Sequence, residues 1–423
     1  MNASFSEIEH TMPGKEIYII TTGRILNAKT AGARRVRNIA LSVASANAKV
    51  IIFSYRDFIE QSPDLHSIYG GVLGYHNTGQ VTEAPKPSLI RFLRVSLSFM
   101  NANRSEAIVF LYPTTFIFRD FVYLIYFKYL KGYRFFCEIN ELRSAITFSS
   151  KSPSGILPKL AYYIKSIRDY ILYSLNEWQV GLYDGITVIS LALERYFARR
   201  AHKMIRIPIL CDCDEIIDGF SCPFYNGEIF KICFAGYIKI DKEGFDILLE
   251  SLGQINKEKT VGLYLYGIIE KEDDQRLKQL TAQFGLSDRV HYMGNIDPGM
   301  LVDEFRKYHL LILPRPLTRR TRFGLSTKLA EYIVSGIPVL VTDVSDNALI
   351  IQDNYNGFII PPGSSRIFKD KILEIIDNYE SRASFIVYNA QRTAREKLDY
   401  RLFSHEYLNF FFGSQRRAKY TDK

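Results

Sequence analysis

The sequence predicts an α/β protein built from two Rossmann-like, doubly wound parallel-sheet domains that face each other across a cleft. Three observations predict this class. Strand-like apolar runs alternate with helix-like stretches along the chain, the alternation restarts after the middle, and an aperiodic segment with glycine and proline separates the halves. With 423 residues, 47% of them hydrophobic, the chain is long enough for two or three globular domains.

The first half alternates strands and helices from its beginning. Short apolar runs separated by helical patterns are typical of parallel strands joined by crossover helices. The predicted strands are Glu16–Thr21, Lys49–Ser54, Ala107–Tyr112, Tyr133–Ile139 and Gly185–Ile189, and a helix is predicted over Arg34–Ala46. The run Phe116–Leu130 contains charged residues, so we expect an amphipathic or buried helix rather than a membrane span.

The second half repeats the pattern. The predicted strands are Lys231–Ala235, Gly262–Tyr266, Arg289–Met293, Leu310–Leu313 and Val339–Thr342, with helices over Phe245–Ile255 and Asp273–Phe284. Residues 211–228 lack periodicity and are the predicted linker. We therefore place an N-terminal Rossmann-like domain at residues 1–215, a C-terminal Rossmann-like domain at 228–400, and a C-terminal helix and tail at 401–423 that can pack back onto the N-terminal domain.

The net charge of +9 is concentrated in the first half. Residues 1–215 hold 26 Lys and Arg against 18 Asp and Glu. This excess favours an anionic partner, such as a membrane face or a phosphorylated substrate, although a solvated basic surface would look the same. Residues 1–15 show neither a basic segment nor an apolar core of a secretory signal. We expect a cytoplasmic protein, with a peripheral position on the inner face of the cell membrane left open by the basic half.

Three cysteines in the linker raise the question of a metal site. Cys211 and Cys213 form a C-x-C with Cys222 nearby, but no complementary pair follows at zinc-binding spacing, and His202 is the only nearby imidazole. Reduced thiols fit a cytoplasmic protein better, so we expect no metal.

The stretch FGLSTKLAEYIVSGIPVLVTD (323–343) reads as a short helix followed by a buried strand. Ser326 is a preferred N-cap residue, and Gly336 followed by Pro338 is a preferred stop. The N-terminus of a helix suits a phosphate, and Ser326, Thr327 and Lys328 would supply amides, hydroxyls and an ammonium group.

Glu331 lies five residues beyond Ser326, or about 7.5 Å along a helix axis. That offset resembles the separation between the diphosphate and the ribose of a nucleotide, and a carboxylate can accept hydrogen bonds from both ribose hydroxyls. The alternative is a surface glutamate paired with Lys328 or Ser335.

The segment KLAEYIVSGIPVLVTD resembles the signature of retaining nucleotide-sugar glycosyltransferases, namely glycosyltransferase family 4 with the GT-B fold. The resemblance extends to LSDRVHYMG (286–294), NYNGF (354–358), PPG (361–363) and YDGITVISLALERY (183–196). It implies that Glu331 binds the ribose of the donor, that the C-terminal domain binds the nucleotide-sugar donor and that the N-terminal domain binds the acceptor.

The resemblance also suggests cations and a glycine loop around the donor. FAGYIKIDKEGFDILLESL (234–252) is similar to a family segment whose lysine contacts the diphosphate; Lys242 matches best and Lys239 second, and either would otherwise be a solvated surface charge. Arg315, in LILPRP, is expected to act as a second cation or to line the sugar pocket, or it is a surface residue after a strand. In TAGARRVRNIALSVA (30–44), Gly32 would let the backbone approach the donor and Arg35 would reach into the cleft, although a glycine before a helix is often a simple turn.

The sequence departs from the family at two positions. Phe323 stands where the E-x7-E motif has its first glutamate, and Asn140 stands where many members carry a histidine. Glu141 and Arg143 match a subgroup that reads "ElR", which would place them at the border of the catalytic cleft. The alternative is an Arg–Glu pair that orders a loop.

The resemblance implies a retaining transfer of a hexose-type sugar from a UDP- or GDP-linked donor to a glycan or a lipid-diphosphate acceptor, without a cofactor. The D-x-D at residues 212–214 lies in the linker, not where a metal-bridged diphosphate would need it, so we expect a metal-independent reaction. A capsule, O-antigen or exopolysaccharide pathway of bacteria would fit. Two alternatives stay open: a GT-B-fold epimerase or sugar phosphorylase, and a non-enzymatic basic protein that binds nucleic acid or membrane. No RNA-binding signature is present, so we expect no nucleic-acid partner.

Overall fold

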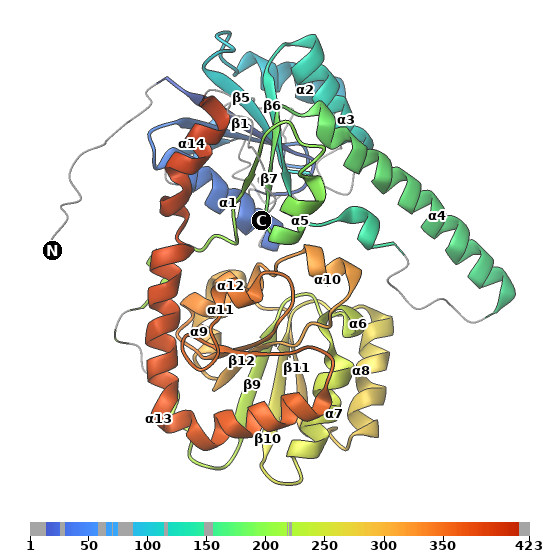
Figure 1. The fold of residues 1–423 in the computed structure, drawn as a ribbon, viewed down its shortest axis with the longest axis vertical. Helices are drawn as coiled ribbons and strands as arrows, with labels where there is room; N and C mark the ends of the chain where they lie inside the picture. Colours follow the sequence, from blue (N-terminus) through green and yellow to red (C-terminus); the bar gives the residue numbers. More distant parts are fainter. Residues whose placement is uncertain are drawn as a thin grey trace.

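The computed structural model describes residues 14–25, 30–57, 65–69, 71–74, 88–113, 117–147, 155–217, 219 and 222–413. Two α/β domains lie one above the other, each with a largely parallel sheet covered by helices on both faces (Figure 1). This confirms the predicted fold class.

The sheet of the N-terminal domain has the strand order β3-β4-β2-β1-β5-β6-β7-β8. All pairs are parallel except β3 with β4. Its strands are β1 (Glu16–Thr21), β2 (Lys49–Ser54), β3 (His66–Tyr69), β4 (Val72–Gly74), β5 (Ala107–Leu111), β6 (Arg134–Ile139), β7 (Gly185–Val188) and β8 (Met204–Arg206). Its helical segments are α1 (Ala31–Ala44), α2 (Leu89–Ser98), α3 (Ile117–Leu124), the π-helical η1 (Ile125–Leu130), η2 (Arg143–Ala145), α4 (Ile156–Trp178), η3 (Gln179–Leu182), α5 (Leu191–Phe197) and η4 (Cys213–Glu215).

The sheet of the C-terminal domain is parallel throughout, in the order β11-β10-β9-β12-β13-β14. Its strands are β9 (Phe230–Ala235), β10 (Val261–Tyr266), β11 (Val290–Gly294), β12 (Leu310–Leu313), β13 (Val339–Thr342) and β14 (Phe358–Ile360). Its helical segments are α6 (Ile240–Glu243), α7 (Phe245–Ile255), α8 (Lys271–Gln283), η5 (Pro298–Met300), α9 (Leu301–Phe305), α10 (Arg319–Phe323), α11 (Lys328–Val334), α12 (Asn347–Ile350) and α13 (Ser365–Lys397).

The predicted strands all form, with ends shifted by one residue at most, because buried parallel strands read as continuous apolar runs. The short strands β3, β4, β8 and β14 and the long helix α4 were not predicted. The described part of the predicted helix 116–130 is split into α3 and η1, which bury Tyr123, Leu124 and Phe127 in the core, as expected of an amphipathic helix. Phe116 lies outside the described residues. Within the described ranges, no helix is long and apolar enough to cross a membrane.

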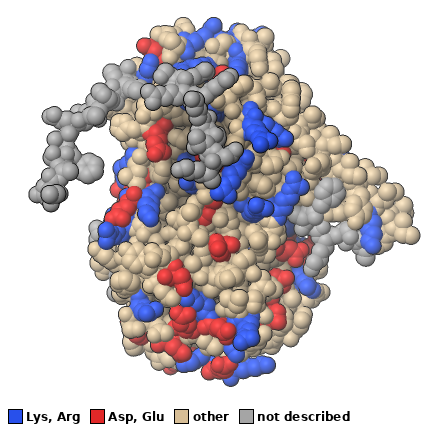
Figure 2. Space-filling view, viewed as in Figure 1, with Lys and Arg blue, Asp and Glu red and all other residues tan. Residues whose placement is uncertain are grey.

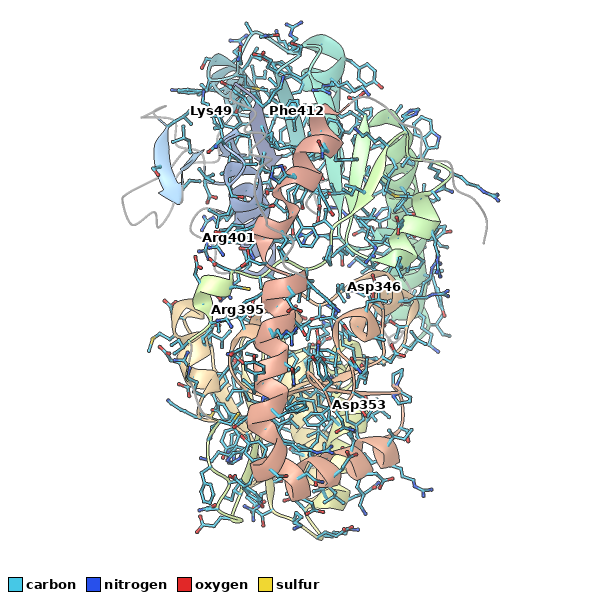
Figure 3. The ribbon with its side chains drawn as sticks, turned by 60° about the vertical axis from the view of Figure 1, so that its left-hand side comes forward. Lys49, Asp346, Asp353, Arg395, Arg401 and Phe412 are labelled. Atoms are coloured by element: carbon cyan, nitrogen blue, oxygen red, sulfur yellow. The ribbon has the colours of Figure 1, made fainter. Side chains whose placement is uncertain are left out.

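The C-terminal end of the described chain returns to the N-terminal domain. Helix α13 runs up from the C-terminal domain, and η6 (Tyr400–Phe403) and α14 (Ser404–Phe412) continue it, as Figure 3 shows between Arg395, Arg401 and Phe412. The ring of Phe411 packs on Phe110 of β5 at 5.4 Å, and that of Phe410 on Phe136 of β6 at 5.3 Å. The two domains are thus joined by two chain crossings rather than one.

The linker cysteines are free thiols. The sulfur atoms of Cys211 and Cys213 lie 3.7 Å apart, and the thiol of Cys222 faces the carbonyl of Gly336 at 3.7 Å. Each of these three thiol groups therefore contacts a neighbouring group of the protein.

Candidate active site

A cavity of about 600 Å³ lies between the two domains, at the carboxyl ends of the strands of both sheets. In each sheet the strand order reverses at the first strand of the domain, between β1 and β5 and between β9 and β12. Ligands of open α/β sheets bind at such points, and the volume suits a nucleotide-sized ligand. Nine of the predicted site residues line this cavity: Gly32, Arg35, Glu141, Lys242, Arg315, Ser326, Thr327, Lys328 and Glu331.

The segment before α11 differs from the prediction at its first residue. Thr327, not Ser326, is the N-cap, and it has helical angles and makes no side-chain capping bond, so the predicted Ser326 cap is wrong. Gly336, with φ of 86°, ends the helix one residue after the C-cap, as predicted. The Ser326 side chain therefore does not cap the helix, and its buried Oγ has no hydrogen-bond partner among the described residues. Burying a hydroxyl group without a hydrogen-bond partner costs free energy, so a ligand that accepts a hydrogen bond from Ser326 would bind more tightly.

Glu331 lies in the first turn of α11, and its side chain is only 16% exposed. Its Oε1 is 3.5 Å from Nη1 of Arg34, which belongs to α1 of the opposite domain. Burial raises the pKa of Glu331, and the charge of Arg34 opposes that rise. The surface alternative, with Lys328 or Ser335 as partner, does not describe this position, because the carboxylate is largely buried in the cleft and contacts Arg34 across the domain boundary.

Glu243, at the end of α6, holds three predicted cations together. The carboxylate is fully buried, with Nε of Arg315 at 3.1 Å, Nζ of Lys328 at 3.2 Å and Nζ of Lys242 at 4.0 Å. Arg315 follows β12 and Lys242 follows β9, two neighbouring strands, whereas Lys328 begins α11. We call these four side chains the cation cluster.

The cation cluster carries more positive than negative charge. Burial alone would raise the pKa of Glu243, but the charges of Arg315 and Lys328 outweigh it and lower the pKa to about 2. Burial, followed by the charge of Arg315, lowers the pKa of Lys242 to about 8, and burial lowers that of Lys328. One carboxylate facing three cations leaves two positive charges uncompensated at the cavity wall. This is the charge that a diphosphate group would balance.

Three predicted site residues have their charged groups bound elsewhere. Arg35 touches the cavity, but its guanidinium forms an ion pair with buried Glu138 at 2.9 Å and donates to the carbonyls of Ile207 and Pro208. Lys239 faces away, toward Glu270 at 3.0 Å. Arg143 is outside the cavity lining and lies 3.9 Å from Asp120. Of the two lysines after β9, the structure brings only Lys242 into the cavity.

The two positions that depart from the family pattern both lie near the domain boundary. Asn140 lines the cavity and donates to the hydroxyl of Tyr112 at 3.0 Å. Phe323, at the end of α10, is outside the lining; its carbonyl accepts from Ser190 Oγ at 2.7 Å and its ring packs against Tyr196. Glu141 lines the cavity, and its closest cation is Arg320 at 4.0 Å rather than Arg143. Phe323 thus contacts the opposite domain, at the position where the family that the sequence resembles carries a carboxylate.

Two glycines allow close packing at the cavity wall. A Cβ on Gly236, after β9, would lie 2.1 Å from Cε of Lys328, and its φ of 143° is unfavourable for other residues. A Cβ on Gly32 would lie 3.3 Å from the hydroxyl of Tyr112. Gly236 therefore makes room for the lysine of the cation cluster, and Gly32 for a tyrosine that lines the cavity.

Glu243 and Arg34 were missed by the sequence interpretation. Glu243 is adjacent to Lys242 in IDKEGFD, and an acid between a lysine and a glycine resembles an ordinary surface residue. Arg34 is adjacent to Arg35, and neighbouring helical residues point about 100° apart, so only the packing of α1 decides which one faces the cleft. The RR pair itself was the only signal.

Residues 229–378 match the family profile described as glycosyl transferases group 1, which covers about a third of the chain. Among curated proteins, the chain is 21% identical over 222 residues to phosphatidyl-myo-inositol mannosyltransferase of Mycobacterium leprae, covering 52% of this chain and 57% of that protein. It is 22% identical over 212 residues to the GtfA subunit of the UDP-N-acetylglucosamine–peptide N-acetylglucosaminyltransferase of Streptococcus pneumoniae, covering 47% and 39%. The matched regions thus cover 57% and 39% of these two relatives, so the chain spans less than two thirds of the length of either.

Solved structures are similar over nearly the whole chain. Sucrose-phosphate synthase of Thermosynechococcus elongatus superposes with a TM-score of 0.66 at 15% identity, covering 93% of this chain and 97% of that one. The Anabaena protein HepE, solved with UDP and glucose, gives 0.62 at 16% identity, covering 93% and 98%. These similarities confirm the GT-B fold.

Proposed function

We propose that this GT-B protein is a glycosyltransferase that moves a sugar from a nucleoside-diphosphate donor to an acceptor hydroxyl. The observation that carries the proposal is the cation cluster, in which three cations face one carboxylate, beside the enclosed carboxylate of Glu331 and the hydroxyl of Ser326, which has no partner within the described ranges. The group 1 profile over the same domain supports it, as do the mannosyl- and N-acetylglucosaminyltransferases named above.

The donor would lie along the C-terminal wall of the cavity. Ser326, Lys328 and Lys242 would hold the diphosphate, and Glu331 would accept from the ribose hydroxyls, exchanging its contact with Arg34. The bond between the anomeric carbon and the diphosphate oxygen would break as charge builds on the leaving diphosphate, which the cation cluster stabilises. The acceptor oxygen would then bond to the same face of the anomeric carbon, and its proton would pass to the departing diphosphate.

In this proposal the reaction retains the anomeric configuration and needs no metal or cofactor, since the cation cluster supplies the charge that a metal would otherwise provide. The position of Glu141 on the N-terminal wall suits contact with the acceptor. We place the acceptor among glycans or lipid diphosphates of bacterial surface polysaccharide synthesis (capsule, O-antigen or exopolysaccharide), with the protein in the cytoplasm and peripheral to the cell membrane.

A calorimetric titration without added metal tests the donor class. UDP, GDP, ADP and CMP are titrated into the full chain, and we expect one diphosphate to bind selectively. HepE was solved with UDP and glucose, which makes UDP the first choice. If none of the four nucleotides binds, the proposed donor site is wrong.

A further inference from the structure

Helix α4 exposes an apolar stripe along most of its 23 residues. Six of its large side chains are each between 52% and 66% exposed: Leu160, Ile164, Ile167, Ile171, Leu175 and Trp178. In Figure 1 the helix projects from the N-terminal domain at the right, and the same projection in Figure 2 is mostly uncharged. Single exposed apolar residues are common, but a continuous stripe of this size marks an interaction surface.

One narrow side of α4 fastens the helix to the domain. Glu177 accepts hydrogen bonds from the backbone N–H of Ser144 at 3.1 Å and from the hydroxyl of Tyr196 at 2.8 Å, and Ser166, three turns earlier, is buried. At 3.6 residues per turn, this side lies roughly 130° around the helix from the centre of the stripe. The stripe is therefore held facing away from the body of the domain.

The stripe is wider than the seam of a two-stranded coiled coil. The residues that best fit a seam are Leu160, Ile164, Ile167, Ile171 and Trp178, with the polar Ser174 among them. Tyr163, Tyr170 and Leu175 then fall at flanking positions, where such coils usually carry charges. With Tyr163 and Tyr170 included, the apolar face extends over roughly 140° of the helix. Pairing with a second copy would therefore leave part of the face uncovered.

The charges beside the stripe are basic. By position on the helix, Lys159 lies beside one edge of the stripe and Arg168 beside the other, and Lys165 lies about 60° further around the helix from Arg168. Asp169 neutralises Arg168 through an ion pair at 2.7 Å, and Glu177 is buried against the body, so Lys159 and Lys165 supply the remaining exposed charge of α4. An apolar face flanked by Lys and Arg, with Tyr and Trp among its members, matches a helix that lies in the surface of an anionic bilayer.

We propose that α4 is a docking surface for a lipid bilayer containing anionic lipids. Its C-terminal end is fastened through Glu177 to η2, which follows Asn140 and Glu141 in the cavity wall. Docking would therefore bring the mouth of the cleft to the membrane. The use of this position to capture a lipid-linked acceptor rests on the proposed function, whereas the docking surface itself does not.

Vesicle flotation with the full chain tests the surface. We expect the protein to float with vesicles of phosphatidylcholine and phosphatidylglycerol, and the double variant Ile164→Ser/Ile171→Ser to bind at least roughly tenfold more weakly. The matched control is Leu349→Ser/Leu402→Ser, two leucines of similar exposure on other elements, which should bind as the parent does. Lys159→Gln/Lys165→Gln should weaken binding to these vesicles but not to phosphatidylcholine alone.

Two results would overturn the inference. One is a parent protein that floats with neither vesicle; the other is an isoleucine variant that floats as well as the parent. Analytical ultracentrifugation of the same proteins tests the other occupant, a second copy of the chain. If the parent is a dimer that does not bind vesicles and the isoleucine variant is a monomer, the stripe is an interface between two copies. Nucleotide titration of the same variants distinguishes a failure of the docking surface from a failure of the proposed function. Unchanged nucleotide affinity shows that a variant is folded, so a loss of vesicle binding in that variant reports on the docking surface alone.

Discussion

Replacing Glu243 by glutamine removes the carboxylate at the centre of the cation cluster while keeping its shape. The variant would leave Arg315, Lys328 and Lys242 around a neutral amide in a buried position. The pKa of Glu243 is lowered from 4.5 to about 2, which at about 1.4 kcal/mol per pH unit corresponds to roughly 3 kcal/mol of stability at pH 7. Breaking a buried charge pair on one side typically costs 3–5 kcal/mol, in the same range.

Thermal and urea unfolding measure this loss. For a domain of this size, about 3 kcal/mol should lower the melting temperature by roughly 6–12 °C. The loss should also depend on pH in a defined direction. Because the folded pKa of Glu243 is depressed, its contribution is complete above pH 4.5 and disappears as the pH falls toward 2, so the difference between parent and variant should shrink over that interval.

The control is Glu374→Gln, since Glu374 is a partly exposed acid that pairs with Lys371 at 3.1 Å, away from the cleft. It should cost no more than about 1 kcal/mol. A Glu243→Gln variant that is as stable as this control at pH 7, or whose deficit persists unchanged at low pH, would refute the charge balance assigned to the cation cluster.

Three further predictions concern the same cleft. The pKa of Lys242 is about 8 in the free protein, and the negative charge of a bound diphosphate should raise it. Near pH 8.5, calorimetry in buffers of different ionisation enthalpy should therefore show proton uptake on binding, and Lys242→Gln should not show it. The affinity for the diphosphate should fall as the pH rises through 8. Ser326→Ala should weaken nucleoside diphosphate binding roughly tenfold without lowering the melting temperature, since its hydroxyl has no hydrogen-bond partner in the described part of the chain; a clear loss of stability would contradict this. Asp346, which accepts from the backbone N–H of Leu191 in the opposite domain at 2.9 Å, helps hold the domains together; Asp346→Asn should enlarge the radius of gyration measured by X-ray scattering in the absence of nucleotide, and an unchanged radius would exclude that role.

The strands and the two-domain organisation could be predicted because they depend on local pattern. A run such as AIVFL in β5 is buried on both faces, which is typical of a parallel strand with helices on both sides of its sheet. The lone short strands could not be predicted, since three residues such as Val72–Gly74 carry no periodicity. Helix α4 was missed because its apolar residues face outward, against the rule by which amphipathic helices are assigned to a core.

The candidate site was predictable as far as motifs extend. The segment from Ser326 to Glu331 and Lys242 follow recognisable patterns, and the structure brings them to one cavity. What could not be predicted is the pairing. Whether Arg35 turns inward to Glu138, or Glu243 joins the distant Arg315 and Lys328, depends on contacts between residues as far as 103 positions apart in the chain. Such contacts are set by tertiary packing, which a single sequence does not display.

In the proposed complex a nucleoside diphosphate spans the cleft wall with its ribose on Glu331. Calorimetric titration of Glu331→Gln with the selected nucleoside diphosphate and, separately, with inorganic pyrophosphate tests it most directly. The loss of charged hydrogen bonds should weaken nucleotide binding roughly tenfold to a hundredfold while pyrophosphate binds as to the parent, and Glu215→Gln, a nearby acid outside this cavity, should change neither. Equal affinity of parent and Glu331→Gln for the nucleotide, or an equal loss for both ligands, would contradict the assignment.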